Sequence, residues 1–115
     1  MGTNYYVIPN RPSIVDPIHI GKSSRGWLFL FQDVDEPYWD TPIKWHSYEE
    51  VKDWLYKNTV ESTEYVIVDE YEMPVLFEEF IDLVDFKQKH YKDNPDNFTY
   101  CRNVNGYRFD EREFV

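Results

Sequence analysis

The alternation of apolar and polar residues separates strand-like stretches from loops along the chain. β-Branched and aromatic side chains fill residues 3–8 and 65–68, which we therefore expect to be strands. Residues 18–20 are short and extended, and residues 27–34 are strongly apolar. Because glycines flank the segment between them, we predict a turn over residues 21–26 that joins these two strands into a hairpin.

Apolar residues recur at helical spacing in two later segments. The first helix is predicted to begin after Ser47, because Ser47 and Glu50 have the spacing of a capping box, and to end near Asn58. The second is predicted over residues 74–90 or 76–90, where acidic residues come early and basic residues late, as the helix dipole favours. Its inward stripe is predicted to be Phe77, Phe80, Ile81 and Val84.

The end of the chain has the pattern of a second hairpin. Residues 98–102 and 107–109 are strand-like, and Asn105-Gly106 between them is a strong turn signal because both residues tolerate positive φ. We predict loops over residues 10–17, 35–42 and 92–97. These elements predict a single domain over residues 1–115 with an α+β fold: a small, mostly antiparallel sheet, two helices packed on one face and a C-terminal hairpin.

Composition adds that the chain can bury a real hydrophobic core. Apolar residues make up 42% of its 115 residues and aromatic residues 19%, which is too rich for a disordered chain. No apolar run approaches the roughly 20 residues that span a bilayer, and no secretory signal is apparent. Cys101 is the only cysteine, so the sequence excludes an internal disulfide and a cysteine-based metal site. We therefore expect a cytoplasmic protein.

The negative charge is concentrated in the middle of the chain. The net charge is −10, from 22 acidic and 12 basic residues. Residues 35–97 hold 17 of the acidic and six of the basic residues, whereas residues 1–34 carry a net charge of +1. A field of this sign repels nucleic acid and anionic membranes and attracts basic surfaces. We therefore expect no direct binding to nucleic acid or membranes; the other interpretation is a solvated face that keeps the protein in solution.

One short basic segment stands apart from this acidic background. Gly21-Lys22-Ser23 is similar to the end of a P-loop, but Asp16 stands where that motif needs glycine, and a strand-like run follows instead of a helix. A turn with free amides, cations and hydroxyls can still hold one anion, such as a phosphate, a nucleotide or a carboxylate of a partner. The alternative is that the glycines serve the turn and the cations pair with the protein's own carboxylates. The residues predicted to bind an anion are His19, Lys22, Ser23, Ser24 and Arg25.

The sequence assigns no catalytic residue and no metal centre. His19, His46 and His90 are far apart, and their spacing does not require a metal. Asp69 and Glu70 follow a strand, and paired carboxylates can perform acid–base chemistry where burial separates their pKa values. A solvated loop is the more ordinary interpretation of these two acids. We expect no cofactor.

Several short motifs resemble an uncharacterised family of small bacteriophage and prophage proteins. The matching motifs are MGTNYY at residues 1–6, IHIGKSS at 18–24 with Gly26-Trp27, IVDEY at 67–71, EEF at 78–80, and GYRF at 106–109 with Glu113-Phe114. The resemblance implies a phage origin and a place of action inside the bacterial host cell, and it implies no activity. Many family members carry a Cys-x-x-Cys pair before the second motif, which this chain lacks, and a turn glycine where this chain has Glu72.

Our leading hypothesis is a non-enzymatic phage accessory protein that binds a host protein with a basic surface, such as a nucleic-acid-binding or defence protein that it would inhibit. The acidic centre speeds the encounter with such a partner, and aromatic side chains anchor interfaces. The residues predicted to form the binding face are Asp35, Glu36, Tyr38, Trp39, Asp40, Glu49, Glu50 and Asp53.

The alternative hypothesis is a binder of phosphate or nucleotides, or an enzyme, centred on residues 19–24. Asp69 and Glu70 would then be its acid–base groups. This alternative would be supported if the basic turn and the acid cluster line one concave pocket, and it would be weakened if they lie on opposite faces. A structural or virion-associated role is a third option.

Overall fold

The computed structural model describes residues 2–10, 17–24, 28–36, 43–91 and 101–110. Within these residues one sheet has seven strands in the order β7-β6-β1-β2-β3-β9-β8. Its strands are β1 (Gly2–Pro9), β2 (Ile18–Ser24), β3 (Leu30–Gln32), β6 (Tyr65–Asp69), β7 (Pro74–Val75), β8 (Cys101–Val104) and β9 (Tyr107–Asp110). Neighbouring strands are antiparallel except β3 and β9, which are parallel.

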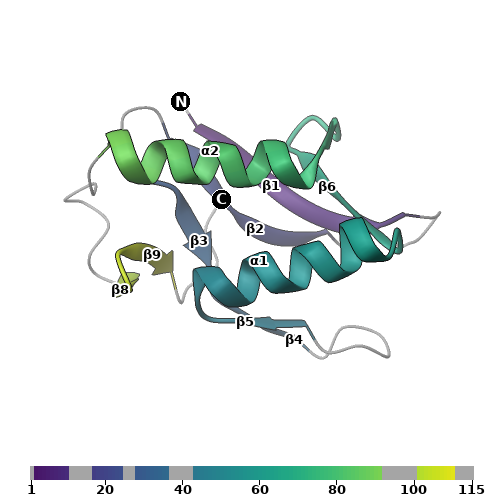
Figure 1. Cartoon of the computed structure of the whole chain (residues 1–115), viewed down its shortest axis with the longest axis horizontal. Helices are drawn as coiled ribbons and strands as arrows, with labels where there is room; N and C mark the ends of the chain where they lie inside the picture. Colours follow the sequence, from purple (N-terminus) through teal and green to yellow (C-terminus); the bar gives the residue numbers. More distant parts are fainter. Residues whose placement is uncertain (1, 11–16, 25–27, 37–42, 92–100, 111–115) are drawn as a thin grey trace.

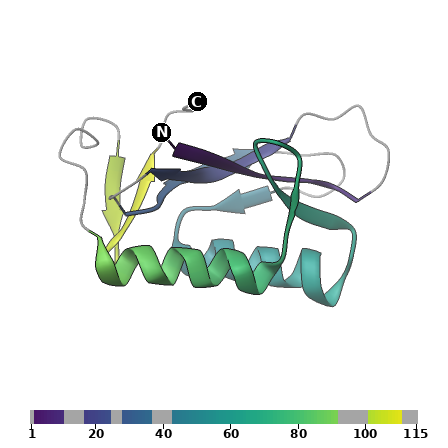
Figure 2. The same ribbon diagram turned by 90° about the horizontal axis from the view of Figure 1, so that it is seen from above.

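Helices α1 (Tyr48–Tyr56) and α2 (Phe77–His90) lie side by side on the same face of this sheet, as Figures 1 and 2 show. The C-terminal hairpin is formed by β8 and β9, whose turn places Asn105 at φ 55° and Gly106 at φ 91°. The predicted α+β fold with a mostly antiparallel sheet, helices on one face and a C-terminal hairpin is therefore confirmed. Residues 98–100 of the predicted hairpin lie outside the described residues.

The predicted pairing of the second and third strands is confirmed, but the predicted turn between them is wrong over residues 21–24. Strand β2 continues through these residues to Ser24, and Gly21 pairs with Phe31 of β3. A Cβ atom at Gly21 would overlap the carbonyl oxygen of Leu30 and the ring of Phe29. The glycine therefore serves a close approach of two strands rather than a turn. The rest of the predicted turn, residues 25–27, lies outside the described part of the chain.

A small second sheet was not expected from the sequence. Strand β4 (Val34–Glu36) pairs antiparallel with β5 (Ile43–Trp45), so the predicted loop is wrong at residues 35–36. The strand predicted over residues 27–34 begins only at Leu30 and is interrupted at Asp33. The indole Nε1 of Trp45 donates a hydrogen bond of 2.8 Å to the Gln32 carbonyl and fixes this hairpin to the main sheet. Three-residue strands are too short for their alternation to be recognised in the sequence.

Helix α1 begins as predicted. The Ser47 hydroxyl accepts a hydrogen bond of 3.2 Å from the Glu50 amide and caps the first turn. The helix does not stop at Asn58, because the regular α-helix ends at Tyr56 and a π-helical turn over Lys57–Glu61 follows. The Asn58 side chain donates to the Trp54 carbonyl at 2.8 Å, so a residue expected to end the helix instead satisfies a carbonyl within it.

Helix α2 begins slightly later than predicted, because Pro74 and Val75 pair with β6 as the short strand β7. Leu76 is the N-cap residue, and its amide donates to the Glu79 carboxylate at 3.2 Å. Of the predicted inward stripe, Phe80 and Val84 are fully buried, whereas Phe77 and Ile81 are only half-buried. These two side chains lie at the margin of the core, next to α1.

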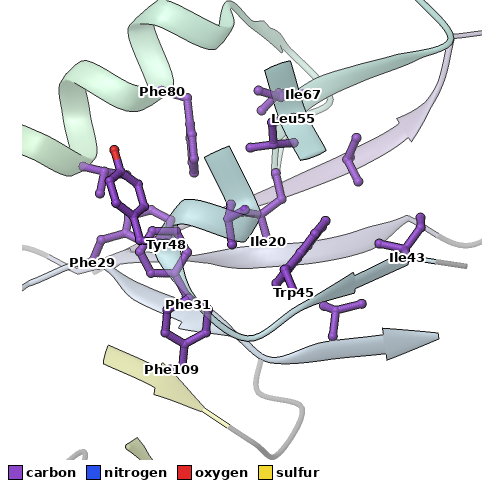
Figure 3. Close-up of a cluster of buried hydrophobic side chains, with 14 residues drawn as sticks. Ile20, Phe29, Phe31, Ile43, Trp45, Tyr48, Leu55, Ile67, Phe80 and Phe109 are labelled. Carbon is purple, nitrogen blue, oxygen red and sulfur yellow. The ribbon is translucent and has the colours of Figure 1, made fainter. Parts of the chain in front are cut away.

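The core is a layer of large rings between the sheet and the helices (Figure 3). Phe31 of β3 and Phe109 of β9 are stacked with ring centroids 4.9 Å apart. Phe80 of α2 points from the helix toward the sheet and meets Phe29 edge-on at 5.4 Å. Rings of this size dominate the buried apolar area of a small domain, so they fix the position of α2 on the sheet.

Candidate functional site

His19, the first of the predicted anion-binding residues, lies on the face of the sheet away from the helices. Its side chain is buried, its ring stacks on Tyr6 at 4.9 Å, and its Nε2 is 3.0 Å from Oδ1 of Asn4. The Asn4 amide nitrogen faces the Glu70 carboxylate at 3.5 Å, which leaves Oδ1 to accept. His19 therefore donates from Nε2, and it serves as a packed, hydrogen-bonded residue of the sheet.

The other residues of the predicted anion site belong to strand β2. Lys22 pairs with both Asn4 of β1 and Leu30 of β3, and Ser23 and Ser24 pair with the start of β1. Residues 22–24 therefore form part of a strand and not the turn of free amides on which the predicted anion site depended. The Ser24 carbonyl accepts a hydrogen bond of 2.5 Å from Nζ of Lys87 on α2. Arg25 lies outside the described residues.

The acid cluster Asp69–Glu72 forms the connection between β6 and β7. Oδ1 of Asp69 accepts the amides of Tyr71 at 2.8 Å and Met73 at 3.0 Å, and the Glu70 carboxylate accepts the Asn4 amide at 2.8 Å. These carboxylates therefore order a tight turn and the adjacent edge of β1. They line a shallow groove of about 350 Å³ together with Tyr6, Ile8, Pro17 and Val68.

Asn4 places the described part of the basic segment near the acid cluster. Asn4 bonds to His19 on one side and to Glu70 on the other. In the part of the chain that the structure describes, neither His19 nor Lys22 lines the groove above Asp69–Glu72. The alternative hypothesis of a phosphate-directed binder or enzyme therefore stays a prediction.

A second groove, of about 410 Å³, lies between α1 and α2 and is lined by Lys52, Asp53, Tyr56, Phe77 and Ile81. We call it the interhelical groove. The two helices run in opposite directions (Figure 1). At one end the Tyr48 hydroxyl donates to Oδ1 of Asp85 at 3.0 Å, and at the other end the rings of Tyr56 and Phe77 meet edge-on at 5.5 Å. The groove is therefore held open between two defined side-chain contacts on regular helices.

Acidic residues dominate the helix segments that border the interhelical groove. Within residues 48–57 and 77–85 the acidic residues are Glu49, Glu50, Asp53, Glu78, Glu79, Asp82 and Asp85, and the basic residues are Lys52 and Lys57. Lys57 forms an exposed ion pair with Asp53 at 3.1 Å, and Nζ of Lys52 lies 5.2 Å above the ring of Tyr48. An exposed pair of this kind leaves the local field strongly negative, because it neutralises one carboxylate among seven.

The residues predicted to form a binding face are only partly brought together. Glu49, Glu50 and Asp53 lie on α1, where Glu50 also caps the helix by accepting the His46 amide at 3.0 Å. Asp35 lies opposite Lys44 in the small sheet, next to Glu36 at the end of β4. The other predicted members, Tyr38, Trp39 and Asp40, lie outside the described residues.

Sequence reasoning missed the contribution of α2 to this surface. Phe77 and Ile81 were expected to be core residues, whereas they line the interhelical groove. Tyr56, which is 45% exposed, was not singled out at all. The available signal was the width of the apolar stripe on α2. An apolar stripe wider than the part of the helix that contacts the sheet indicates that the edges of the stripe face something else.

Burial shifts the pKa values of two tyrosines near Asp85, Tyr48 and Tyr107. Burial raises the pKa of Tyr48, and the hydrogen bond to Asp85 raises it further. Burial also raises the pKa of Tyr107, with a further contribution from the same carboxylate, and the two rings are stacked at 4.3 Å. Tyr48 is therefore a neutral donor at physiological pH, and its hydrogen bond to Asp85 joins α1 to α2.

Searches of protein-family models, of curated proteins and of solved structures gave no match for this chain. Among the described residues, no group of three or more His, Cys, Asp or Glu side chains is placed to hold a metal ion. None of the helices formed by those residues is both long and apolar enough to cross a membrane.

Proposed function

We propose that this protein is a non-enzymatic phage accessory protein that binds a basic host protein in the bacterial cytoplasm. The observation that carries the proposal is the interhelical groove, in which apolar side chains of Tyr56, Phe77 and Ile81 lie between two helices rich in carboxylates. Aromatic side chains in partly enclosed positions are typical anchors of protein interfaces.

The charge of the helices supports a basic partner in particular. Long-range attraction raises the rate of encounter with a positively charged surface, and like charge disfavours acidic partners. A host protein that normally holds nucleic acid presents such a surface, and an acidic face that occupies it would block the nucleic acid. This is the basis for proposing that the protein inhibits a nucleic-acid-binding or defence protein.

The proposal is tested by capture of partners from host lysate by the immobilised full chain at low and at high ionic strength. We expect a partner retained at about 50 mM salt and largely released at about 500 mM, because screening weakens surface attraction. The double variant Glu49→Lys, Asp82→Lys should lose this partner, since both acids border the interhelical groove.

The matched control is the double variant Glu64→Lys, Glu72→Lys. It changes the net charge by the same amount at exposed positions outside the two groove-forming helices. It should retain the partner. The absence of any partner at low salt, or equal loss in the two double variants, would contradict the proposal.

A further inference from the structure

The interhelical groove has an apolar end, and an exposed carboxylate lies beyond its other end. Tyr56, Phe77 and Ile81 form the apolar end, where the two rings are in contact and Ile81 lies one helical turn farther along α2. Asp85 lies one more turn along α2, where it accepts the Tyr48 hydroxyl and is itself exposed. A ligand that fits this groove must therefore combine an apolar group with a polar or charged one.

The spacing of the two ends is set by the helices. Tyr48 contacts Asp85 and Tyr56 contacts Phe77, so the antiparallel register places Lys52 beside Ile81 in the middle. Eight residues of α1 separate the two contacts, which corresponds to about 12 Å along the helix axis. From Ile81 to Asp85 the rise is about 6 Å, one helical turn. The groove thus has room for one side chain of a ligand and for a second side chain one helical turn away, and it is too short to hold a long helix.

Charge selects the chemistry of the occupant. Glu49 and Asp53 on α1, and Glu78, Asp82 and Asp85 on α2, all lie within about a turn of the groove and are exposed. Nζ of Lys52 lies over the Tyr48 ring, on the side of Asp85, so it leaves the apolar end free of cationic charge and offsets part of the negative charge near Asp85. A second copy of this chain would bring the same acidic helices face to face, which is unfavourable. A cationic segment gains from every one of these carboxylates.

We propose that the interhelical groove takes one large apolar side chain of the partner, flanked one helical turn away by arginine or lysine. The apolar side chain packs against Tyr56, Phe77 and Ile81, and the cation pairs with Asp85. This inference rests on the proposed function and names the segment that the partner must present. An apolar anchor gives such a segment specificity that charge alone cannot supply, because any cation is attracted to an acidic surface.

The test uses two short, alanine- and glutamine-rich peptides in binding titrations followed by NMR of the full-length protein. One peptide carries a leucine with an arginine one helical turn to either side, and the other carries serine in place of the leucine. We expect the leucine peptide to bind about tenfold or more tightly, since burial of one leucine side chain has at least this effect on affinity. Its binding should shift the resonances of Tyr56 and Ile81.

Variants of the protein give a second, independent arm. Tyr56→Ala and Ile81→Ala should each weaken the leucine peptide about tenfold and leave the serine peptide unchanged. Phe86→Ala is the matched control, because Phe86 is an equally exposed ring (52%) on α2 that does not line the groove. It should bind both peptides as the unmodified protein does.

Two outcomes would overturn the inference in distinguishable ways. Equal affinities for the leucine and serine peptides would show that charge alone attracts the segment, and the proposed function would survive without an anchor. Loss of leucine-peptide binding in Phe86→Ala as large as in Tyr56→Ala would place the contact elsewhere on α2. Failure of the proposed function itself would instead appear as no host partner at low salt.

Discussion

Helix α2 carries the same side chain in two opposite environments. Phe80 is fully buried and meets the rings of Phe29 and Tyr5, whereas Phe86 is 52% exposed and contacts His90 and Tyr91 at the end of the same helix. The inner ring packs against the sheet across the core, whereas the described contacts of the outer ring are with residues at its own end of the helix. The identity of a ring therefore says little about its role until its surroundings are known.

The difference extends to the whole helix layer. Phe31 and Phe109 are stacked within the cluster of buried hydrophobic residues, whereas Tyr56 and Phe77 lie beside Asp53 and Lys52. Inner rings contribute to stability, because removing them leaves a cavity. Phe77 is half-buried and packs against the core, whereas Tyr56 is 45% exposed, so loss of the Tyr56 ring should cost less stability than loss of an inner ring. The four predictions below test this division, beginning with the largest effect.

The largest effect is expected at the inner ring of α2. Phe80→Ala should lower the free energy of unfolding by about 3–5 kcal/mol, because it removes a buried ring and leaves a cavity next to Phe29. Phe86→Ala should change it by no more than about 0.5 kcal/mol. Urea unfolding followed by circular dichroism measures both. Similar losses in the two variants would contradict the division into inner and outer rings.

Close packing around Gly21 should make this position sensitive to the addition of a single methyl group. Gly21→Ala places a methyl group against the Leu30 carbonyl and the Phe29 ring, and it should cost about 1–3 kcal/mol. Ser23→Ala, two residues along the same strand, is the control and should be nearly neutral. Thermal unfolding of both variants is the measurement. A stable Gly21→Ala protein would mean that β2 and β3 can separate without loss of the core.

The regular elements of the fold could be predicted because their signals are local. The Ser47 cap is recognised from two side chains three residues apart, and the Asn105-Gly106 turn from two residues that accept positive φ. The Gly21 segment was misread because glycine has two uses. Whether it bends the chain or admits a neighbouring strand depends on Leu30 and Phe29, which lie across the sheet.

The candidate site was predictable only in its charge. The acids of α1 were expected from the sequence, but the groove depends on the register of α1 against α2, which brings Tyr56 to Phe77 across 21 residues. Such a register is set by packing on the sheet and has no local signature. For the same reason, the hydrogen bond of His19 to Asn4, which explains a histidine in the basic segment, could not be foreseen.

Tyr48 lies on the boundary between the inner and outer sides, and its contribution should depend on pH. Figure 3 shows its hydroxyl pointing toward α2, where Asp85 accepts it. Burial raises the pKa of Tyr48 above the usual 10.0, so the folded state holds this proton more tightly than the unfolded state. Its stabilising effect is complete below about pH 10 and is lost as the pH rises further.

Tyr48→Phe should therefore cost about 1 kcal/mol near neutral pH, where the hydrogen bond is intact. The difference between the two proteins should narrow above about pH 10, because ionisation of Tyr48 destabilises only the unmodified protein. Burial lowers the pKa of Lys87, whose effect on stability has the opposite sign but is shared by both proteins. Urea titrations of both proteins across this pH range measure the difference between their free energies of unfolding. A difference that is constant with pH would contradict the assigned cause.

The smallest effect is expected outside the core, where backbone conformation matters more than packing. Glu72 is exposed in the β6–β7 connection and adopts φ 63°, a left-handed conformation that costs an L-residue about 1–2 kcal/mol. Glu72→Gly removes this strain and adds freedom to the unfolded chain, so a net gain of up to about 1 kcal/mol is expected.

Position 72 is thus one where glycine should be favoured by backbone conformation alone. Asn105, at φ 55°, is the comparison: Asn105→Gly should gain less, because asparagine already tolerates this region. Thermal unfolding of the two variants shows which of them gains more stability. A destabilised Glu72→Gly protein would show that the Glu72 side chain makes a contribution larger than its backbone strain, and that exposed positions of this protein are not as tolerant as the contrast between Phe80 and Phe86 implies.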